Sequence, residues 1–97
     1  MYARVITTQV KPGAMEEATG IYESSIVPAM KKQPGFRGAR LLVNADTNAA
    51  VSMTFWETEA DMLAGEASSY LQTELAKLGP HFAAPPANAH YEVRVQI

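Results

Sequence analysis

Residues 33–61 read QPGFRGARLLVNADTNAAVSMTFWETEAD, and this stretch decides the fold. It opens on a proline and a glycine that stop a helix, and it ends where a second helix begins. Between them we predict two strands, over residues 36–45 and 49–57, joined by turn-forming residues at 46–48. The second strand alternates between two faces of a sheet: Val51, Met53 and Phe55 on one, Ser52, Thr54 and Trp56 on the other.

The residues before this stretch predict one strand and one helix. Residues 2–10 are rich in β-branched side chains and end at a Lys-Pro-Gly turn, so we predict a strand there. Residues 14–32 carry apolar side chains at helical spacing, with acids in the first turn and lysines in the last. Pro28 lies inside this helix and lacks a backbone donor, so we expect a kink or a frayed last turn there.

The residues after the stretch predict a second helix and a last strand. Thr58 and the acid three positions on resemble a capping box, which places the helix start at Thr58. Apolar side chains continue at helical spacing up to a Gly-Pro stop. We expect Gly65 to break this helix, with a fresh start near Ser69. Two prolines mark a connector over 83–89, and residues 90–97 alternate as a strand.

The elements follow the order βαββαβ, which is that of the ferredoxin-like split βαβ arrangement. We therefore predict an α+β fold with one domain over residues 1–97. Its antiparallel four-stranded sheet has the first and third strands at the centre and both helices on one face. The helix-free face carries many apolar side chains, and leaving each in water would forgo roughly 1.5–3 kcal/mol. A second copy packing sheet to sheet would cover them, so we predict a homodimer.

Composition and charge argue against several classes of protein. A net charge of −2 does not supply the basic face that a nucleic-acid partner needs. No apolar run approaches about 18 residues, so we expect no membrane partner, and the first residues lack a secretory signal pattern. The chain has no cysteine, and its histidines and acids lack metal-ligand spacing, so we expect neither a disulfide nor a metal site. We expect a cytoplasmic location.

Several short motifs then occur in a fixed order: Lys11-Pro12-Gly13, Ile26-Val27-Pro28-Ala29-Met30, Gln33-Pro34-Gly35-Phe36, and Phe55-Trp56-Glu57 before Glu59-Ala60. In this order and spacing the chain resembles the antibiotic biosynthesis monooxygenase family of dimeric α/β barrels, over nearly its whole length. The resemblance implies a ferredoxin-like protomer, a barrel formed by two facing sheets, and a small pocket between sheet and helices in each protomer.

The resemblance also implies a chemistry that needs no cofactor. In family members that oxidise small polycyclic phenols, a tryptophan at the matching strand end lines the pocket, with a polar side chain four residues earlier. Those positions here are Trp56 and Ser52, on one strand face, and some relatives have asparagine in place of Ser52. An electron-rich phenolate reduces dioxygen itself, so the protein need only bind, desolvate and orient it. Trp56 and Ser52 are therefore candidate catalytic and substrate-binding residues.

Other side chains are candidates on their own chemistry. His81 follows a helix stop, from which it can reach a pocket mouth and act as a base near neutral pH. Asn44 lies at a strand end and can donate to a substrate carbonyl. Tyr22 and Tyr70 fall on helix faces that meet the sheet, with their hydroxyls at a pocket rim. We interpret His90 as structural. A cation near an anionic substrate would come from one of three arginines: Arg37, Arg40 and Arg94.

Haem degradation, a second activity in the family, is not expected. Members with that activity have a histidine late in the second helical region, a tryptophan earlier in it and an asparagine on the first strand. By spacing from Trp56, those helical positions fall near Leu75 and Gly65, and the first strand has no asparagine.

We therefore predict a homodimeric, cofactor-independent monooxygenase that acts on a small aromatic or quinol-type molecule. The alternative is a non-catalytic small-ligand-binding or accessory dimer of the same fold, because no acid–base pair or nucleophile stands out in the sequence.

Overall fold

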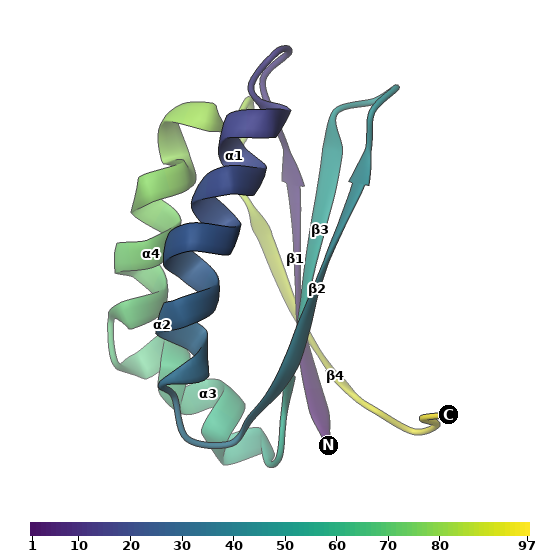
Figure 1. Cartoon of the computed structure of the whole chain (residues 1–97). Helices are drawn as coiled ribbons and strands as arrows, with labels where there is room; N and C mark the ends of the chain where they lie inside the picture. The colour runs from purple at the N-terminus through teal and green to yellow at the C-terminus, as the bar shows by residue number, and fades with distance from the viewer.

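Four antiparallel strands form one sheet, and the helices cover a single face of it (Figure 1). The computed structural model describes residues 1–97. In chain order the elements are β1 (Tyr2–Gln9), α1 (Met15–Ile21), α2 (Val27–Lys31), β2 (Phe36–Asn44), β3 (Ala49–Trp56), α3 (Glu59–Ala67), α4 (Tyr70–Leu78) and β4 (Ala87–Glu92). The strand order β2-β3-β1-β4 places β1 and β3 at the centre. The predicted α+β, ferredoxin-like architecture is confirmed.

The register of the two central strands decides which side chains face the helices. Ile6 lies opposite Ser52, and Val5 lies opposite Met53. Directly opposed residues share a face of the sheet and successive residues alternate. Ile6 and Ser52 line a cavity beneath the helices, so Val5 and Met53 point away from them. The alternation predicted for the strand over residues 49–57 is therefore confirmed.

The first helical region runs from Met15 to Lys31 and changes pitch midway. α1 passes into a π-helical turn, Tyr22–Ile26, and α2 then begins with Pro28 in its first turn. Proline has no backbone N–H for the carbonyl of Ser24, four residues earlier, so the hydrogen-bond ladder loosens just before it. We expected the irregularity at Pro28 or after it, but it precedes the proline.

The second helical region is two helices, and the break between them lies after Ala67. Thr58 caps α3 as predicted, because its hydroxyl accepts a hydrogen bond from the Asp61 amide at 3.1 Å. The chain turns at Ser69, whose φ is +63°. The break expected at Gly65 is wrong, since Gly65 is buried inside α3. A side chain there would meet the ring of Tyr70, only 2.7 Å from a Cβ, so the glycine serves close packing and not a bend.

The last strand is β4, Ala87–Glu92, and the predicted strand over residues 90–97 is wrong in both bounds. β4 pairs only with β1, and Tyr2, the first residue of β1, lies opposite Glu92. The alternating sequence continues past this point, but its partner strand has ended. The C-terminal segment therefore leaves the sheet, as Figure 1 shows.

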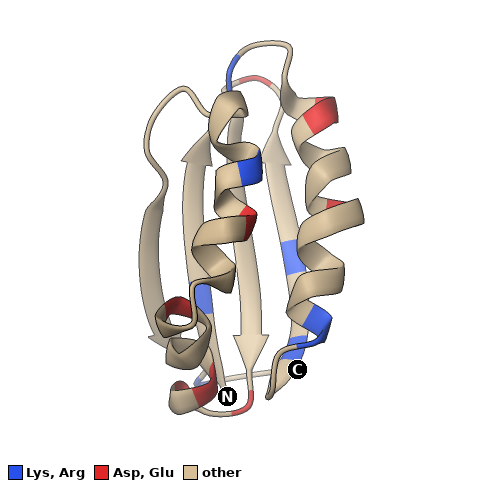
Figure 2. Cartoon of the chain, turned by 90° about the vertical axis from the view of Figure 1, so that its left-hand side faces the viewer, with Lys and Arg blue, Asp and Glu red and all other residues tan.

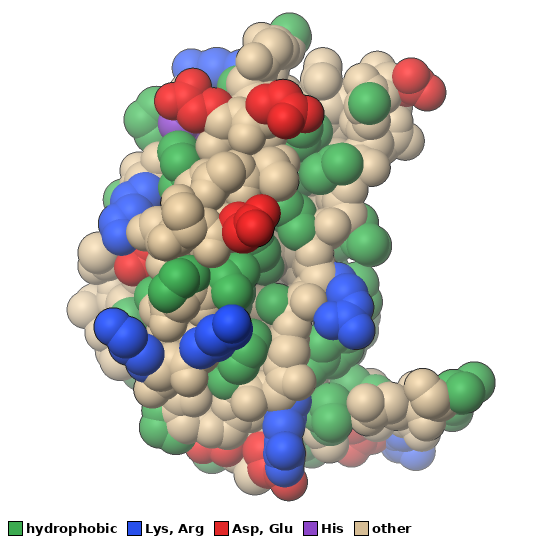
Figure 3. Space-filling model, in the orientation of Figure 1, with side chains coloured by type: hydrophobic (Ala, Val, Ile, Leu, Met, Phe, Trp, Pro, Cys, Tyr) green, Lys and Arg blue, Asp and Glu red, His purple; other side chains and the backbone are tan.

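The helix-free side of the sheet, here called the free face, is apolar as predicted. It carries the side chains of six large hydrophobic residues: Val5, Leu42, Val51, Met53, Phe55 and Tyr91. Leu42 and Tyr91 are 52% and 57% exposed. Hydrophobic side chains are visible along this side in the space-filling view (Figure 3, right).

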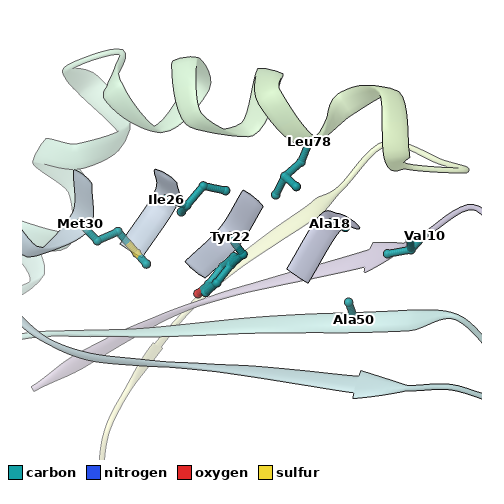
Figure 4. Close-up of a cluster of buried hydrophobic side chains, with 7 residues drawn as sticks. All are labelled: Val10, Ala18, Tyr22, Ile26, Met30, Ala50 and Leu78. Atoms are coloured by element: carbon teal, nitrogen blue, oxygen red, sulfur yellow. The ribbon is translucent and has the colours of Figure 1, made fainter. Parts of the chain in front are cut away.

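The hydrophobic core lies between the helix-covered face of the sheet and the helices. Its main cluster joins both helical regions to β3 and to Val10, the residue after β1, and is drawn in Figure 4: Val10, Ala18, Tyr22, Ile26, Met30, Ala50 and Leu78. Acidic and basic residues are interspersed over the outer surface of the helices (Figure 2). None of the helices combines the length and the apolar character that a bilayer span requires.

Candidate functional site

A cavity of about 60 Å³ lies between the covered face of the sheet and the helices. Apolar side chains from β1, β3 and the helices make most of its wall, as the core of a two-layer fold requires. The polar side chains in the wall are fewer and come from both layers: Arg4, Thr8, Thr19, Tyr22, Ser52, Thr54 and Glu74. An apolar cavity with a few polar groups is the usual form of a small-molecule binding site.

The size of the cavity limits what can enter without rearrangement. Its volume holds a few water molecules and is smaller than the roughly 150 Å³ cavity that takes up benzene. Met15 and Met30 are part of its wall, and unbranched methionine side chains change rotamer easily. A ligand with one aromatic ring therefore requires these side chains to move aside.

Tyr22 and Ser52 form a polar pair inside this apolar chamber. Their hydroxyl oxygens are 2.7 Å apart, so one donates a hydrogen bond to the other. Tyr22 comes from the π-helical turn, and Figure 4 shows its ring and hydroxyl directed at the sheet. Burial raises the pKa of the Tyr22 hydroxyl above its ordinary value of 10.0, the hydrogen bond to Ser52 opposes this, and Tyr70 adds to it. Tyr22 is therefore neutral near pH 7 and can donate a hydrogen bond, but it is not a base.

Arg4 is a cation in the same wall and is almost completely buried, with 1% of its side chain exposed. Its Nη2 atom donates a hydrogen bond to the backbone carbonyl of Met62 in α3. The guanidinium carbon lies 5.3 Å from the centre of the Trp56 ring, within range of a cation–π interaction. The nearest carboxylate oxygen belongs to Glu66 and lies 3.7 Å from Arg4 Nε.

Trp56 itself is fully buried at the end of β3. Its indole N–H donates to Thr54 Oγ1 at 2.9 Å, and its ring meets Phe36 edge-on with centroids 5.6 Å apart. The tryptophan is not part of the cavity wall, whereas its neighbours Arg4 and Thr54 are. Trp56 therefore influences the cavity indirectly, through its contacts with these two side chains.

A comparison with protein-family models finds one match, to the antibiotic biosynthesis monooxygenase family, over residues 1–84. The chain belongs to this family. The predicted resemblance is thereby confirmed. A comparison with curated proteins finds no match.

Solved structures of the same fold include several monooxygenases. SnoaB of Streptomyces nogalater, described as a cofactor-independent oxygenase, is 18% identical, with a TM-score of 0.81 over 99% of this chain and 95% of its own. The monooxygenase ActVA-Orf6 of Streptomyces coelicolor, solved with nanaomycin D, is 24% identical, with a TM-score of 0.75 over 99% and 89%. Rv0793 of Mycobacterium tuberculosis is 17% identical, with a TM-score of 0.76 over 98% and 96%. At these identities the similarity establishes the shared fold.

Of the residues that the family resemblance singled out, the structure brings Ser52 to the cavity with Tyr22 and sets Trp56 behind it. Tyr70 packs against the core cluster, and its buried hydroxyl has no hydrogen-bond partner. Asn44 is at the far end of β2, where its Oδ1 accepts hydrogen bonds from the amides of Asp46 and Thr47. Asn44 therefore shapes the β2–β3 turn and is not in the cavity wall.

The two histidines lie outside the cavity wall. His81 follows α4, with its Nε2 3.4 Å from a carboxylate oxygen of Glu17. His90 lies on the edge strand β4, with its Nε2 2.8 Å from Glu66 Oε2. No three His, Asp or Glu side chains gather closely enough to hold a metal ion.

Sequence reasoning missed Arg4, the one cation of the cavity wall. The arginines it considered are exposed, and two of them pair with acids on the surface: Arg37 with Glu57 and Arg94 with Glu92. The missed signal is the period-two pattern of β1, in which Arg4 shares a face with Ile6. An arginine in phase with core residues of a central strand is buried, and a buried charge needs a reason.

Proposed function

We propose that this protein is a monooxygenase that oxidises a small phenolic or quinol-type molecule without a bound cofactor. The observation that carries the proposal is the Tyr22–Ser52 pair inside an apolar chamber, in a chain of the antibiotic biosynthesis monooxygenase family. Absence of a cofactor is proposed by analogy with SnoaB, which is described as cofactor-independent.

The chemistry asks little of the protein because the substrate supplies the electrons. An ionised phenol transfers electrons to dioxygen, and the ring carbon para to the oxygen then bonds one oxygen atom. That carbon becomes a carbonyl, and the second oxygen atom leaves as water with two hydrogens from the substrate, so a phenol and dioxygen give a quinone and water. A dry chamber that holds the reactants in contact contributes through orientation and exclusion of solvent.

We assign the hydrogen-bonding roles to Tyr22 and Ser52. Neutral Tyr22 donates a hydrogen bond to the substrate oxygen. Ser52, its partner at 2.7 Å, orients the tyrosine hydroxyl or donates a hydrogen bond to a second substrate oxygen. We assign Trp56 a supporting part in substrate binding, through the side chains that it holds against the cavity. Asn44, His81 and Tyr70 lie off the cavity wall, and we propose no contact between them and the substrate.

We further propose that the protein acts as a homodimer in the cytoplasm. The free face would leave six large apolar side chains beside water, and a second copy packed against it buries them. Two free faces in contact give the barrel that the family resemblance implies.

Oxygen uptake with a panel of one-ring and polycyclic phenols that bear hydrogen on the carbon para to the hydroxyl tests the proposed reaction. We expect protein-dependent uptake and, with ¹⁸O₂, one labelled oxygen atom in each product molecule. Tyr22→Phe and Ser52→Ala remove the pair, and Thr73→Ala on the exposed side of α4 is the matched control. Uptake no faster than that of protein-free solution across the whole panel would refute the proposal.

One observation favours the second candidate function, a non-catalytic small-ligand-binding or accessory dimer. The only carboxylate in the cavity wall, Glu74, is engaged by Lys77 at 3.0 Å and by Ser25 at 3.2 Å, so no free base faces the chamber. Quenching of Trp56, the single tryptophan, by ligands that are never oxidised would select this candidate.

A further inference from the structure

Arg4 has hydrogen-bonding capacity that the protein does not use. Its Nη2 donates to the Met62 carbonyl, but its Nε is buried and has no hydrogen-bond partner. A buried guanidinium is strongly disfavoured unless its charge and its N–H groups are matched. The spare donor belongs to a side chain in the wall of the cavity.

The nearest acid does not meet this demand. Glu66 is 3.7 Å from Arg4 Nε, which is beyond hydrogen-bonding distance. Glu66 Oε1 accepts a hydrogen bond from Asn88, and Oε2, the oxygen that faces Arg4, also lies 2.8 Å from His90 Nε2 but accepts no hydrogen bond. Glu66 is thus an ion-pair neighbour of Arg4, but it leaves the Arg4 Nε donor without a hydrogen bond.

A second unpartnered polar atom lies beside the guanidinium. The Tyr70 hydroxyl is buried without a partner, and both it and Arg4 Nη2 would be 3.2 Å from a Cβ on Gly65. The absence of a side chain at Gly65 lets the two groups approach each other. The unpartnered Tyr70 hydroxyl therefore lies close to the guanidinium of Arg4, although Tyr70 itself is not part of the cavity wall.

We propose that Arg4 is the anion-binding group of the cavity and that the ligand is an aromatic anion, with its ring among the apolar side chains and its charged oxygen at the guanidinium. This inference rests on the proposed function, which places a small aromatic molecule in the chamber. Guanidinium groups recognise planar, delocalised oxyanions such as carboxylates and phenolates, and such hydrogen bonds are strengthened by charge.

The assignment accounts for the lack of a base in the cavity wall. A neighbouring cation favours the ionised form of an acid, so Arg4 would hold a phenol as the phenolate that reacts with dioxygen. It also gives Trp56 a defined part as a positioning residue. Its ring packs against the guanidinium, whose carbon lies 5.3 Å from the ring centre, and so restricts the positions open to the Arg4 side chain.

The smallest matched pair of probes is benzoate and benzamide, which have the same shape and differ in charge. Isothermal titration calorimetry of the wild-type protein should show benzoate binding about tenfold or more tightly, as a charged hydrogen bond predicts. Arg4→Met, which keeps the length of the side chain, should abolish the preference and leave benzamide affinity within about twofold. Arg37→Met, an exposed arginine outside the cavity, is the control and should keep the preference.

Two further variants keep the test decisive if Arg4→Met does not fold. Glu66→Gln removes the competing carboxylate and should raise the benzoate preference. Trp56→Phe should lower it and leave benzamide affinity nearly unchanged, which a purely structural role would not do. Equal wild-type affinities for the two probes, or a preference that survives Arg4→Met, would overturn the anion site and leave the proposed function standing. Failure of both probes to bind would also overturn the anion site, and the oxygen-uptake panel would still decide the proposed function separately.

Discussion

Both faces of the sheet depart from the distribution expected of a single domain in water. On the covered face, under the helices, the central strands carry Arg4, Ser52 and Thr54. On the free face the same strands carry only apolar side chains at the neighbouring positions, among them Val5 and Met53. A sheet with one solvated face normally puts its polar residues outside.

The comparison shows that polar groups interrupt the covered face and that large apolar groups remain uncovered on the free face. Under the proposed function, the polar groups beneath the helices serve a ligand and the apolar groups on the opposite side pack against another copy of the chain. Trp56 and Phe55 illustrate the difference between the faces, because they are adjacent in β3 and their side chains lie on opposite faces of the sheet. The following variants are paired across the sheet for that reason, in descending order of expected effect.

Trp56→Ala should have the largest effect, lowering the free energy of unfolding by about 3–5 kcal/mol because it empties a fully buried site. Phe55→Ala, its neighbour on the free face, should weaken association of the chains more than it weakens the fold. Urea denaturation followed by circular dichroism at several protein concentrations separates the two. If both variants showed the same concentration dependence, the division between the faces would be wrong.

Val5→Glu should abolish the dimer, because it places a charge on each of two opposed free faces. The unpaired buried carboxylates would cost about 3 kcal/mol or more, over a hundredfold in the dissociation constant. Sedimentation equilibrium at micromolar concentration measures the effect. Ala76→Glu, on the exposed side of α4, should leave the dimer intact. A dimer that persists in the Val5 variant would contradict sheet-to-sheet packing.

Ser52→Ala should lower kcat/KM about tenfold, because one hydrogen bond in the chamber is worth about 1.4 kcal/mol. Tyr22→Phe should have the same effect, and the double variant should be no worse than either single one, since the two hydroxyls act as a pair. Val51→Ala, adjacent to Ser52 but on the free face, should leave kcat/KM within twofold. Additive losses in the double variant would show that the hydroxyls act separately.

The smallest effect concerns pH and the raised pKa of Tyr22. Its folded-state pKa lies above the ordinary value of 10.0, so the neutral hydroxyl favours folding below pH 10. This contribution is lost as the pH rises from 10 through the raised pKa, where the unfolded chain releases the proton first. The difference in unfolding free energy between the wild type and Tyr22→Phe should therefore shrink above pH 10. A constant difference would mean that Tyr22 is not buried in the folded protein.

The sequence predicted the topology because local signals and alternation agreed along the strands. The Thr58 cap and the two-sided pattern of β3 are properties of a few adjacent residues. The ends of elements were harder, because they depend on partners distant in sequence. β4 ends where β1 ends, and Gly65 serves close packing because the Tyr70 ring occupies the space that a side chain there would need.

The candidate site was predictable in part for the same reason. Ser52 could be placed on the covered face by alternation, and Tyr22 by its helical phase. Trp56 shares the face of Ser52, yet Arg4 lies between its ring and the chamber. That arrangement depends on how an arginine on β1 packs against a tryptophan some fifty positions away, and periodicity within one strand contains no information about it.

The packing around Gly65 limits which residues homologues can have at this position. Any side chain at that position would collide with the Tyr70 ring and crowd the Arg4 guanidinium. Homologues that keep a tyrosine at position 70 should therefore keep the glycine in α3, whereas homologues with a small side chain at position 70 can accommodate a side chain at position 65.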